Sequence, residues 1–236
     1  MPKRFELINT RICDLRLNLK TSPLYSRVRA LYGELSSRDL RFRPPCYFAD
    51  EWFVPEGDPV IGIPFFLATK ELRGLEQKEI GEVEGSTRAY FMKLLRHEAG
   101  HAICYAFRLH RHPLYRQVFG SSRKPFSDVY RFNPRSKHHV INLTDHYAQS
   151  HPDEDFAETF AVWLEMSEAG WRRKYAGWKA LKKLEAVAQM MMAIERKTPL
   201  VRTGEKMCRA SKLKITLKKF YTRRRAALIR SGARAK

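Results

Sequence analysis

Two histidines lie four residues apart, at His97 and His101, inside a stretch typical of a long, half-buried helix. This stretch, residues 88–109, contains no proline and has its single glycine at Gly100. Residues four apart on a helix share one face with about 6 Å between them, so the two imidazoles point to one place. A fold for this chain must therefore bury a helix that carries two neighbouring histidines on one side.

The residue after the first histidine is acidic, which makes the pattern chemically specific. The residues His97-Glu98-Ala99-Gly100-His101 match the pattern HExxH. In a chain of this length and composition, the expected number of chance matches to this pattern is only about 0.02. Two imidazole nitrogens can bind one tetrahedral metal ion, and Glu98 can aim its carboxylate at a water molecule in the open coordination position. The alternative is a helix whose two histidines have purely structural hydrogen bonds.

A metal site of this kind needs a third protein ligand, and the sequence excludes one source of it. The short-spaced pattern HExxHxxGxxH would need glycine at 104 and histidine at 107, where this chain has Cys104 and Phe107. A second helix, predicted over residues 152–164, offers carboxylates instead. Glu154 and Glu158 lie four apart on one face, so one can bind the metal while the other accepts a hydrogen bond from a ligand histidine and fixes its tautomer.

Other side chains stay open as alternative ligands. Cys104 lies one turn beyond His101 and could approach the metal, while a small buried thiol is the more ordinary explanation. Six further histidines in regions predicted to be loops could supply the third ligand, although solvated or capping roles are the more ordinary explanation: His110, His112, His138, His139, His146 and His151.

The two motifs together resemble the gluzincin metallopeptidases. The second motif of that class has the form ExxA(D/E), and residues 154–158 read Glu-Asp-Phe-Ala-Glu. In gluzincins the first glutamate of this motif is a zinc ligand. The resemblance therefore implies one zinc ion per chain, bound by His97, His101 and Glu154, with Glu158 supporting a ligand histidine.

The resemblance extends beyond these two motifs. In the catalytic domain of anthrax lethal factor, a tyrosine seven residues before the glutamate assists the reaction, and Tyr147 has that offset here. A wider stretch, residues 94–184, resembles a family of bacterial zinc-binding metallopeptidases. The resemblance implies peptide-bond hydrolysis by metal-activated water, with Glu98 as general base and Tyr147 as a donor to the developing oxyanion. A packed aromatic with a satisfied hydroxyl is the alternative for Tyr147.

The remaining pattern predicts an α+β fold, a zincin-like body that is mostly helical with a small sheet. Prolines punctuate aromatic and β-branched stretches before residue 68, which predicts short strands. The expected strands are residues 46–48, 52–54, 60–67 and 138–143. Apolar periodicity predicts further helices: two within residues 6–35, one over 70–82, an extension of the second-motif helix to 166, and one over 171–194.

Composition narrows the class of chain. Of the 236 residues, 44% are apolar, which excludes a disordered chain. The four cysteines are far apart, which predicts free thiols. No apolar run approaches the roughly 20 residues that span a bilayer, and the first 20 residues lack the apolar core of a secretory signal. We therefore expect a soluble, cytoplasmic protein.

Positive charge is concentrated at the C-terminal end. The chain has a formal net charge of +20, and residues 196–236 hold 15 of its 45 Lys and Arg residues beside one acidic residue, Glu205. This predicts a metallopeptidase domain over residues 1–195 and a basic C-terminal extension over residues 196–236. The extension is expected to be either a flexible, solubilising tail or a binding site for nucleic acid or an acidic partner, with Phe220 or Tyr221 able to stack on a base.

Two functions remain open at this stage. The first is a zinc-dependent hydrolase that acts on a peptide or protein substrate. The second is a protein that binds nucleic acid or a protein partner and whose zincin-like body is structural or inactive. The residues of the two motifs favour the first, because a structural zinc has no use for Glu98 and usually closes its fourth position with a protein ligand. The substrate and the oligomeric state are not predicted.

Overall fold

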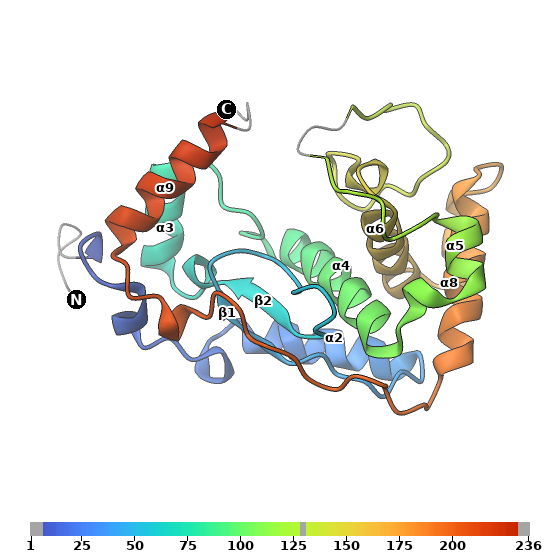
Figure 1. Ribbon diagram of the computed structural model, residues 1–236, viewed down its shortest axis with the longest axis horizontal. Helices are drawn as coiled ribbons and strands as arrows, with labels where there is room; N and C mark the ends of the chain where they lie inside the picture. The colour runs from blue at the N-terminus through green and yellow to red at the C-terminus, as the bar shows by residue number, and fades with distance from the viewer. Residues whose placement is uncertain (1–6, 128–130, 231–236) are drawn as a thin grey trace.

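A computed structural model describes residues 7–127 and 131–230 (Figure 1). Its regular elements, in chain order, are α2 (Tyr25–Ser37), β1 (Cys46–Ala49), β2 (Ile61–Pro64), α3 (Lys70–Ile80), α4 (Arg88–Phe107), α5 (Pro113–Val118), α6 (Pro152–Glu165), α7 (Glu168–Lys174), α8 (Ala180–Ile194) and α9 (Leu217–Arg230). The prediction of an α+β fold, mostly helical with a small sheet, is confirmed. Among the described helices, none combines the length and apolar character needed to cross a membrane.

Helices α4 and α6 pack against each other in the middle of the molecule (Figure 1). Helices α3 and α9 contact each other at one end, while α5 and α8 do so at the other. Helix α2 packs against α4 from below in this view. The helices predicted from the two motifs are thus confirmed, and they form the centre of the fold.

Local sequence explains where α4 begins and how it meets α6. Thr87 caps its first turn, because its hydroxyl oxygen accepts a hydrogen bond from the backbone N–H of Tyr90 at 3.1 Å. Gly100 lies directly against α6, where a Cβ atom would be only 2.9 Å from the Cα of Ala157. The glycine between the two histidines therefore permits the close helix approach that brings side chains of α4 and α6 to one point.

Helix α6 also has a well-defined start. Pro152 occupies its first turn, where a missing N–H is tolerated, and the His151 ring accepts a hydrogen bond from the N–H of Asp153 at 3.1 Å. Three acidic residues, Asp153 to Asp155, fill the first turn and favour the positive end of the helix dipole. Glu154 is therefore held at the start of a rigid, buried helix.

The sheet is smaller than the sequence predicts. Strands β1 and β2 pair in parallel, with Cys46 opposite Ile61. The predicted strand at residues 52–54 is wrong, because Phe53 makes only a single bridge to Gly62. The predicted strand at residues 60–67 is also too long, since the chain turns into a 3-10 helix after Pro64.

The predicted strand at residues 138–143 is wrong for a different reason. The backbone N–H of Leu143 donates to the carboxylate of Glu158 at 3.0 Å, and that of Ile141 donates to the hydroxyl of Tyr175 at 3.2 Å. Hydrogen bonds that would join a strand to a sheet are thus made to side chains of α6 and of the chain after α7.

Two helix predictions need correction. Residues 171–194 do not form one helix, because the chain turns between α7 and α8 at Gly177, whose φ is +75°. Within residues 6–35 only α2 is a full helix, and the segment before it has 3-10 turns at Ile12–Leu15 and Leu19–Thr21. In that segment the N–H of Ile12 bonds to the carbonyl of Ile215, so its backbone pairs with the C-terminal chain. Glu6, at the start of the predicted range, lies outside the described residues.

The basic C-terminal segment packs onto the body. The N–H of Leu200 donates to the carbonyl of Ala106 at 2.9 Å. Leu217, Phe220 and Tyr221 are buried in the same apolar core as the residues of α2, α4 and α6. A flexible tail is therefore wrong for the described part of this segment, while residues 231–236 lie outside the described chain.

Candidate metal centre

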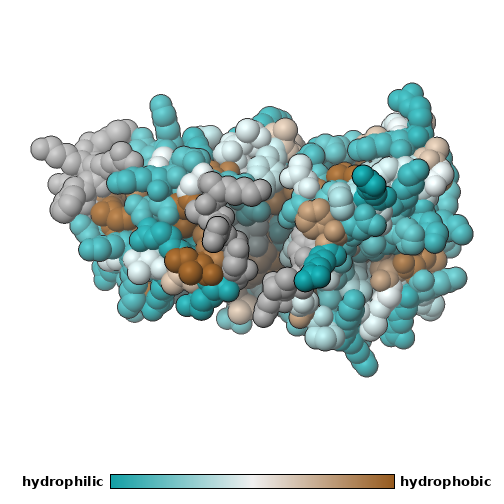
Figure 2. Space-filling model, turned by 90° about the horizontal axis from the view of Figure 1, so that it is seen from above, coloured by the Kyte–Doolittle hydropathy of each residue, from teal (hydrophilic) through white to brown (hydrophobic). Residues whose placement is uncertain are grey.

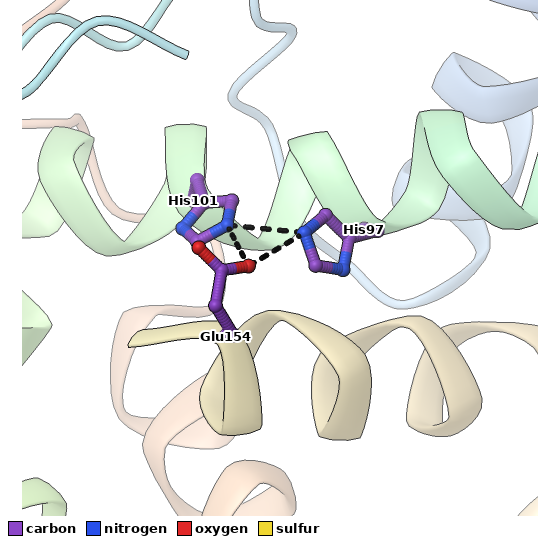
Figure 3. A group of neighbouring side chains, drawn as sticks. All are labelled: His97, His101 and Glu154. Atoms are coloured by element: carbon purple, nitrogen blue, oxygen red, sulfur yellow. Dashed lines mark hydrogen bonds and ion pairs between the residues drawn. The ribbon is translucent and has the colours of Figure 1, made fainter. Parts of the chain in front are cut away.

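Three side chains from α4 and α6 converge on one point (Figure 3). The Nε2 atom of His97 lies 3.2 Å from Nε2 of His101 and 3.0 Å from Oε2 of Glu154. The Nε2 atom of His101 lies 3.1 Å from the same carboxylate oxygen. This places the two predicted histidines and the predicted glutamate together.

The spacing fits a tetrahedral metal ion. Nitrogen and oxygen ligands at 2.0–2.1 Å from a tetrahedral zinc ion lie about 3.3 Å from one another. The three observed separations, 3.0 to 3.2 Å, are close to this value. His97 and Glu154 are also almost fully buried, at 4% and 7% exposure, so packing restricts the positions of their side chains. The donor set and its geometry therefore fit zinc.

The ionisable groups of the cluster shift one another's pKa values. Burial opposes the protonated form of His97, yet the adjacent carboxylates of Glu154 and Glu158 outweigh it and raise the pKa of His97 well above its usual value. Burial likewise opposes ionisation of Glu154, but the two imidazoles hold the pKa of that carboxyl well below its usual range. The cluster thus favours an ionised Glu154 facing a cation.

The second carboxylate of α6 holds His97 from behind. Glu158 is completely buried, and its Oε1 atom accepts a hydrogen bond from Nδ1 of His97 at 2.8 Å. This bond keeps a proton on Nδ1, so Nε2, which points to the common point, is the nitrogen that would give up its proton to bind a metal. The geometry matches the supporting role that the sequence predicts for Glu158.

Two groups that fix Glu158 were missed in the sequence. Nδ2 of Asn142 donates to Oε1 of Glu158 at 2.7 Å, and the N–H of Leu143 donates to its Oε2 atom at 3.0 Å. Asn142 is 3% exposed, and its backbone carbonyl accepts a hydrogen bond from the ammonium group of Lys93 of α4. The only signal for this residue is an amide inside the apolar run Val140-Ile141-Asn142-Leu143, which the strand prediction passed over.

Glu98 is placed for a different role. Its side chain lines a cavity of about 670 Å³ that also contains the three converging side chains, yet it does not belong to their cluster. Glu98 is 6% exposed, and burial raises its pKa to about 7. A buried carboxylate with such a pKa can both accept and release a proton near neutral pH.

Tyr147 also lines this cavity. It begins the 3-10 turn Tyr147–Gln149, which packs against α6, and its ring centroid lies 5.9 Å from that of His97. The hydroxyl of Ser150 donates to the carbonyl of Tyr147 at 2.7 Å and holds this turn. The tyrosine is thus next to the cluster, as its offset from Glu154 predicts.

The alternative ligands have other contacts. Within the described residues, neither Cys104 nor any of the six other histidines joins the cluster. His112 and His151 cap helices α5 and α6. His110 lies 4.0 Å from the sulfur of Cys104, and His146 stacks on the ring of Phe132. All four cysteines are free thiols, as predicted.

The cavity walls come largely from segments without a motif. The lining includes Trp52, Phe53 and Val54, and also the chain from Ser122 to Phe126. Charged side chains of both signs line it as well, including Glu84 and Arg123. The cavity in front of the cluster therefore has both apolar and polar walls. It can accommodate a ligand that has both kinds of group.

Two histidines and a carboxylate that converge from a pair of packed helices can hold a metal ion. The profile of the family described as "Putative zinc-binding metallo-peptidase" matches residues 72–218, more than half of the chain. The chain belongs to this family, which confirms the family resemblance found in the sequence. No curated protein and no solved structure matches the chain.

Proposed function

We propose that the protein is a zinc-dependent peptidase of the gluzincin type, with a zincin-like body. The observation that carries this proposal is the convergence of Nε2 of His97, Nε2 of His101 and Oε2 of Glu154 within 3.2 Å of one another. A structural zinc site closes its coordination with a fourth protein ligand, whereas this cluster has three ligands within the described part of the chain and faces a cavity. The arrangement therefore supports a reactive metal position.

His97, His101 and Glu154 would hold the ion. When bound in such a site, zinc lowers the pKa of a coordinated water to about 7 and polarises a carbonyl oxygen. Glu158 keeps the ring of His97 in the tautomer that presents Nε2. Asn142 and Leu143 fix Glu158 in turn, so the ligand set is held before a substrate arrives.

The remaining site residues would handle protons and charge. Glu98 accepts the proton of the attacking water and passes it to the leaving amine, a role that suits a buried carboxyl with a pKa of about 7. Tyr147, which lines the same cavity, donates a hydrogen bond to the carbonyl oxygen as negative charge develops on it. The substrate is a peptide or protein segment that lies in the cavity between Trp52 and Phe126.

A single substitution tests the reaction. The Glu98→Gln variant keeps the shape of the side chain and removes the proton acceptor, so we expect zinc content to stay unchanged and peptide hydrolysis to fall by at least about 10²-fold. Hydrolysis is measured with mixed peptide and protein substrates by mass spectrometry. Glu79→Gln, in α3 and away from the cavity lining, serves as a matched control. Full activity in Glu98→Gln would overturn the proposed role.

A further inference from the structure

The C-terminal segment carries positive charges on a backbone that is packed against the rest of the protein. Three of its cations have ion pairs in the described chain: Arg196 with Asp39, Arg224 with Glu76 and Arg225 with Glu79. The ten other cations between residues 196 and 230 are exposed and have no ion pair among the described residues: Lys197, Arg202, Lys206, Arg209, Lys212, Lys214, Lys218, Lys219, Arg223 and Arg230.

Main-chain hydrogen bonds to the N-terminal part of the chain hold the first part of this segment in place. The N–H of Cys13 donates to the carbonyl of Leu213 at 3.0 Å, and the chain around Thr216 pairs antiparallel with Arg11. Leu213 is half-buried against the body, whereas Lys212, the last residue of the 3-10 turn Ala210–Lys212, and Lys214, in the chain that follows, are exposed.

Helix α9 forms the second part of the C-terminal segment. Phe220 and Tyr221 are buried in the core, which fixes the face that α9 turns inward. Lys219, Arg223 and Arg230 recur at spacings of four and seven residues, so they form one stripe on the exposed face. At 1.5 Å per residue the stripe is about 16 Å long. The packing of α9 therefore fixes these cations in a row on the surface of the protein.

We propose that these exposed cations, Lys212, Lys214, Lys219, Arg223 and Arg230, form a surface that binds the phosphate backbone of nucleic acid. We call them the basic surface. A row of unpaired, exposed cations releases counterions when it meets a phosphate backbone, which is the main source of sequence-independent affinity. Because Phe220 and Tyr221 are buried, they cannot stack on bases, and contact is restricted to phosphates.

The packing of α9 argues against a membrane as the partner. A helix that lies in a membrane interface buries its apolar face in lipid. In α9 this face is already buried in the protein, and Ile229 is its one exposed large apolar side chain. Seen from above, the surface is mostly hydrophilic, with apolar residues in small, separate patches (Figure 2). Phosphate on a nucleic acid is therefore the better match.

The test is a binding titration with the full-length protein. Fluorescence anisotropy is measured with a labelled DNA duplex and a labelled single-stranded RNA, each of mixed sequence, at salt concentrations from about 50 to 200 mM. The test variant is Lys219→Glu/Arg223→Glu/Arg230→Glu. The control is Arg173→Glu/Lys179→Glu/Lys182→Glu, which makes the same charge change at exposed cations near the other end of the molecule.

We expect the parent protein to bind with an affinity that falls steeply with salt and depends little on sequence. The α9 variant should lose at least about tenfold in affinity, and its slope of log affinity against log salt should be smaller by up to about 3. The control variant should stay within about threefold of the parent. Zinc content and circular dichroism, which this surface does not affect, should be the same in all three proteins.

Three results would overturn the proposal. The first is no binding of the parent to either nucleic acid at the lowest salt. The second is an equal loss of affinity in both charge-reversal variants, which would show that net charge alone is responsible. The third is retention on vesicles of equal parts phosphatidylcholine and phosphatidylserine without binding to nucleic acid, which would identify a membrane surface as the partner.

Discussion

Single residues around Glu158 determine how firmly the candidate ligands are held. The spacing of the motifs predicted the positions of His97, His101, Glu154 and Glu158, because each pair lies four apart on one helix. Asn142 could not be found in this way. It comes from an irregular segment of the chain, and only the folded structure places its amide 2.7 Å from Glu158.

The role of Asn142 can be measured through metal affinity. In Asn142→Ala, Oε1 of Glu158 loses one of its two donors, so His97 is held less firmly. Loss of such a supporting contact typically lowers metal affinity by 10- to 100-fold, and we expect about tenfold for zinc, measured by competition with a chelator. The exposed Asn18→Ala change is the control. Unchanged zinc affinity in Asn142→Ala would show that Glu158 does not need this amide.

At the scale of elements, the close approach of α4 to α6 depends on Gly100. Alanine there would place a Cβ atom 2.9 Å from the backbone of Ala157, so the helices must move apart. We expect Gly100→Ala to lower the free energy of unfolding by about 1–3 kcal/mol and to weaken zinc binding. Both are measured on the purified variant, by urea unfolding and chelator competition.

Gly74 provides the matched control for this change. It lies within α3, and a Cβ atom there would meet nothing within 4 Å. Alanine is a better helix former than glycine by about 0.5–1 kcal/mol, so Gly74→Ala should leave stability unchanged or raise it. Similar effects of the two substitutions would mean that close packing at Gly100 is not what sets the helix distance.

The contact between α3 and α9 predicts a pH dependence of stability. Glu76 is completely buried, and burial raises its pKa to about 7, against the opposing effect of Arg224, whose Nη1 atom lies 3.0 Å away. The unfolded chain has the ordinary value of 4.5, so the folded chain holds a proton that the unfolded chain releases. The stability contributed by this proton is full below about pH 4.5 and is lost as pH rises through about 7.

Urea unfolding at pH 5 and pH 8 measures this effect. Glu76→Gln cannot titrate, so we expect it to lose less stability than the parent between these pH values, by roughly 2 kcal/mol. Glu79→Gln, on the same helix and paired with Arg225, should follow the parent. The same pH dependence in all three proteins would contradict a raised pKa at Glu76.

Elements with strong periodicity and clear ends were predicted well, and irregular ones were not. Helices α4 and α6 have capping residues and long apolar stripes that sequence patterns detect. The break between α7 and α8 depends on a single left-handed glycine, Gly177. Residues 138–143 resemble a strand in composition, but their hydrogen bonds go to distant side chains, which no local pattern records.

At the scale of the whole molecule, one apolar core includes residues from both ends of the chain. Charge counting correctly identified the C-terminal segment as basic, yet it could not reveal that Leu217, Phe220 and Tyr221 pack inside. The backbone N–H of Leu217 donates to the carbonyl of Thr10, about 200 residues away in sequence, and the ring of Phe220 packs against that of Phe65. Deleting this segment would remove core residues, so charge reversal on the surface is the cleaner test of its binding role.

Metal content of the purified protein tests the central claim most directly. Elemental analysis should find about one zinc per chain in the parent protein and in the His112→Ala control, which changes only a helix cap. His97→Ala and Glu154→Ala should each lose most of this zinc, because each removes one of three ligands. A parent protein without zinc, or zinc content unaffected by Glu154→Ala, would contradict a metal centre between α4 and α6.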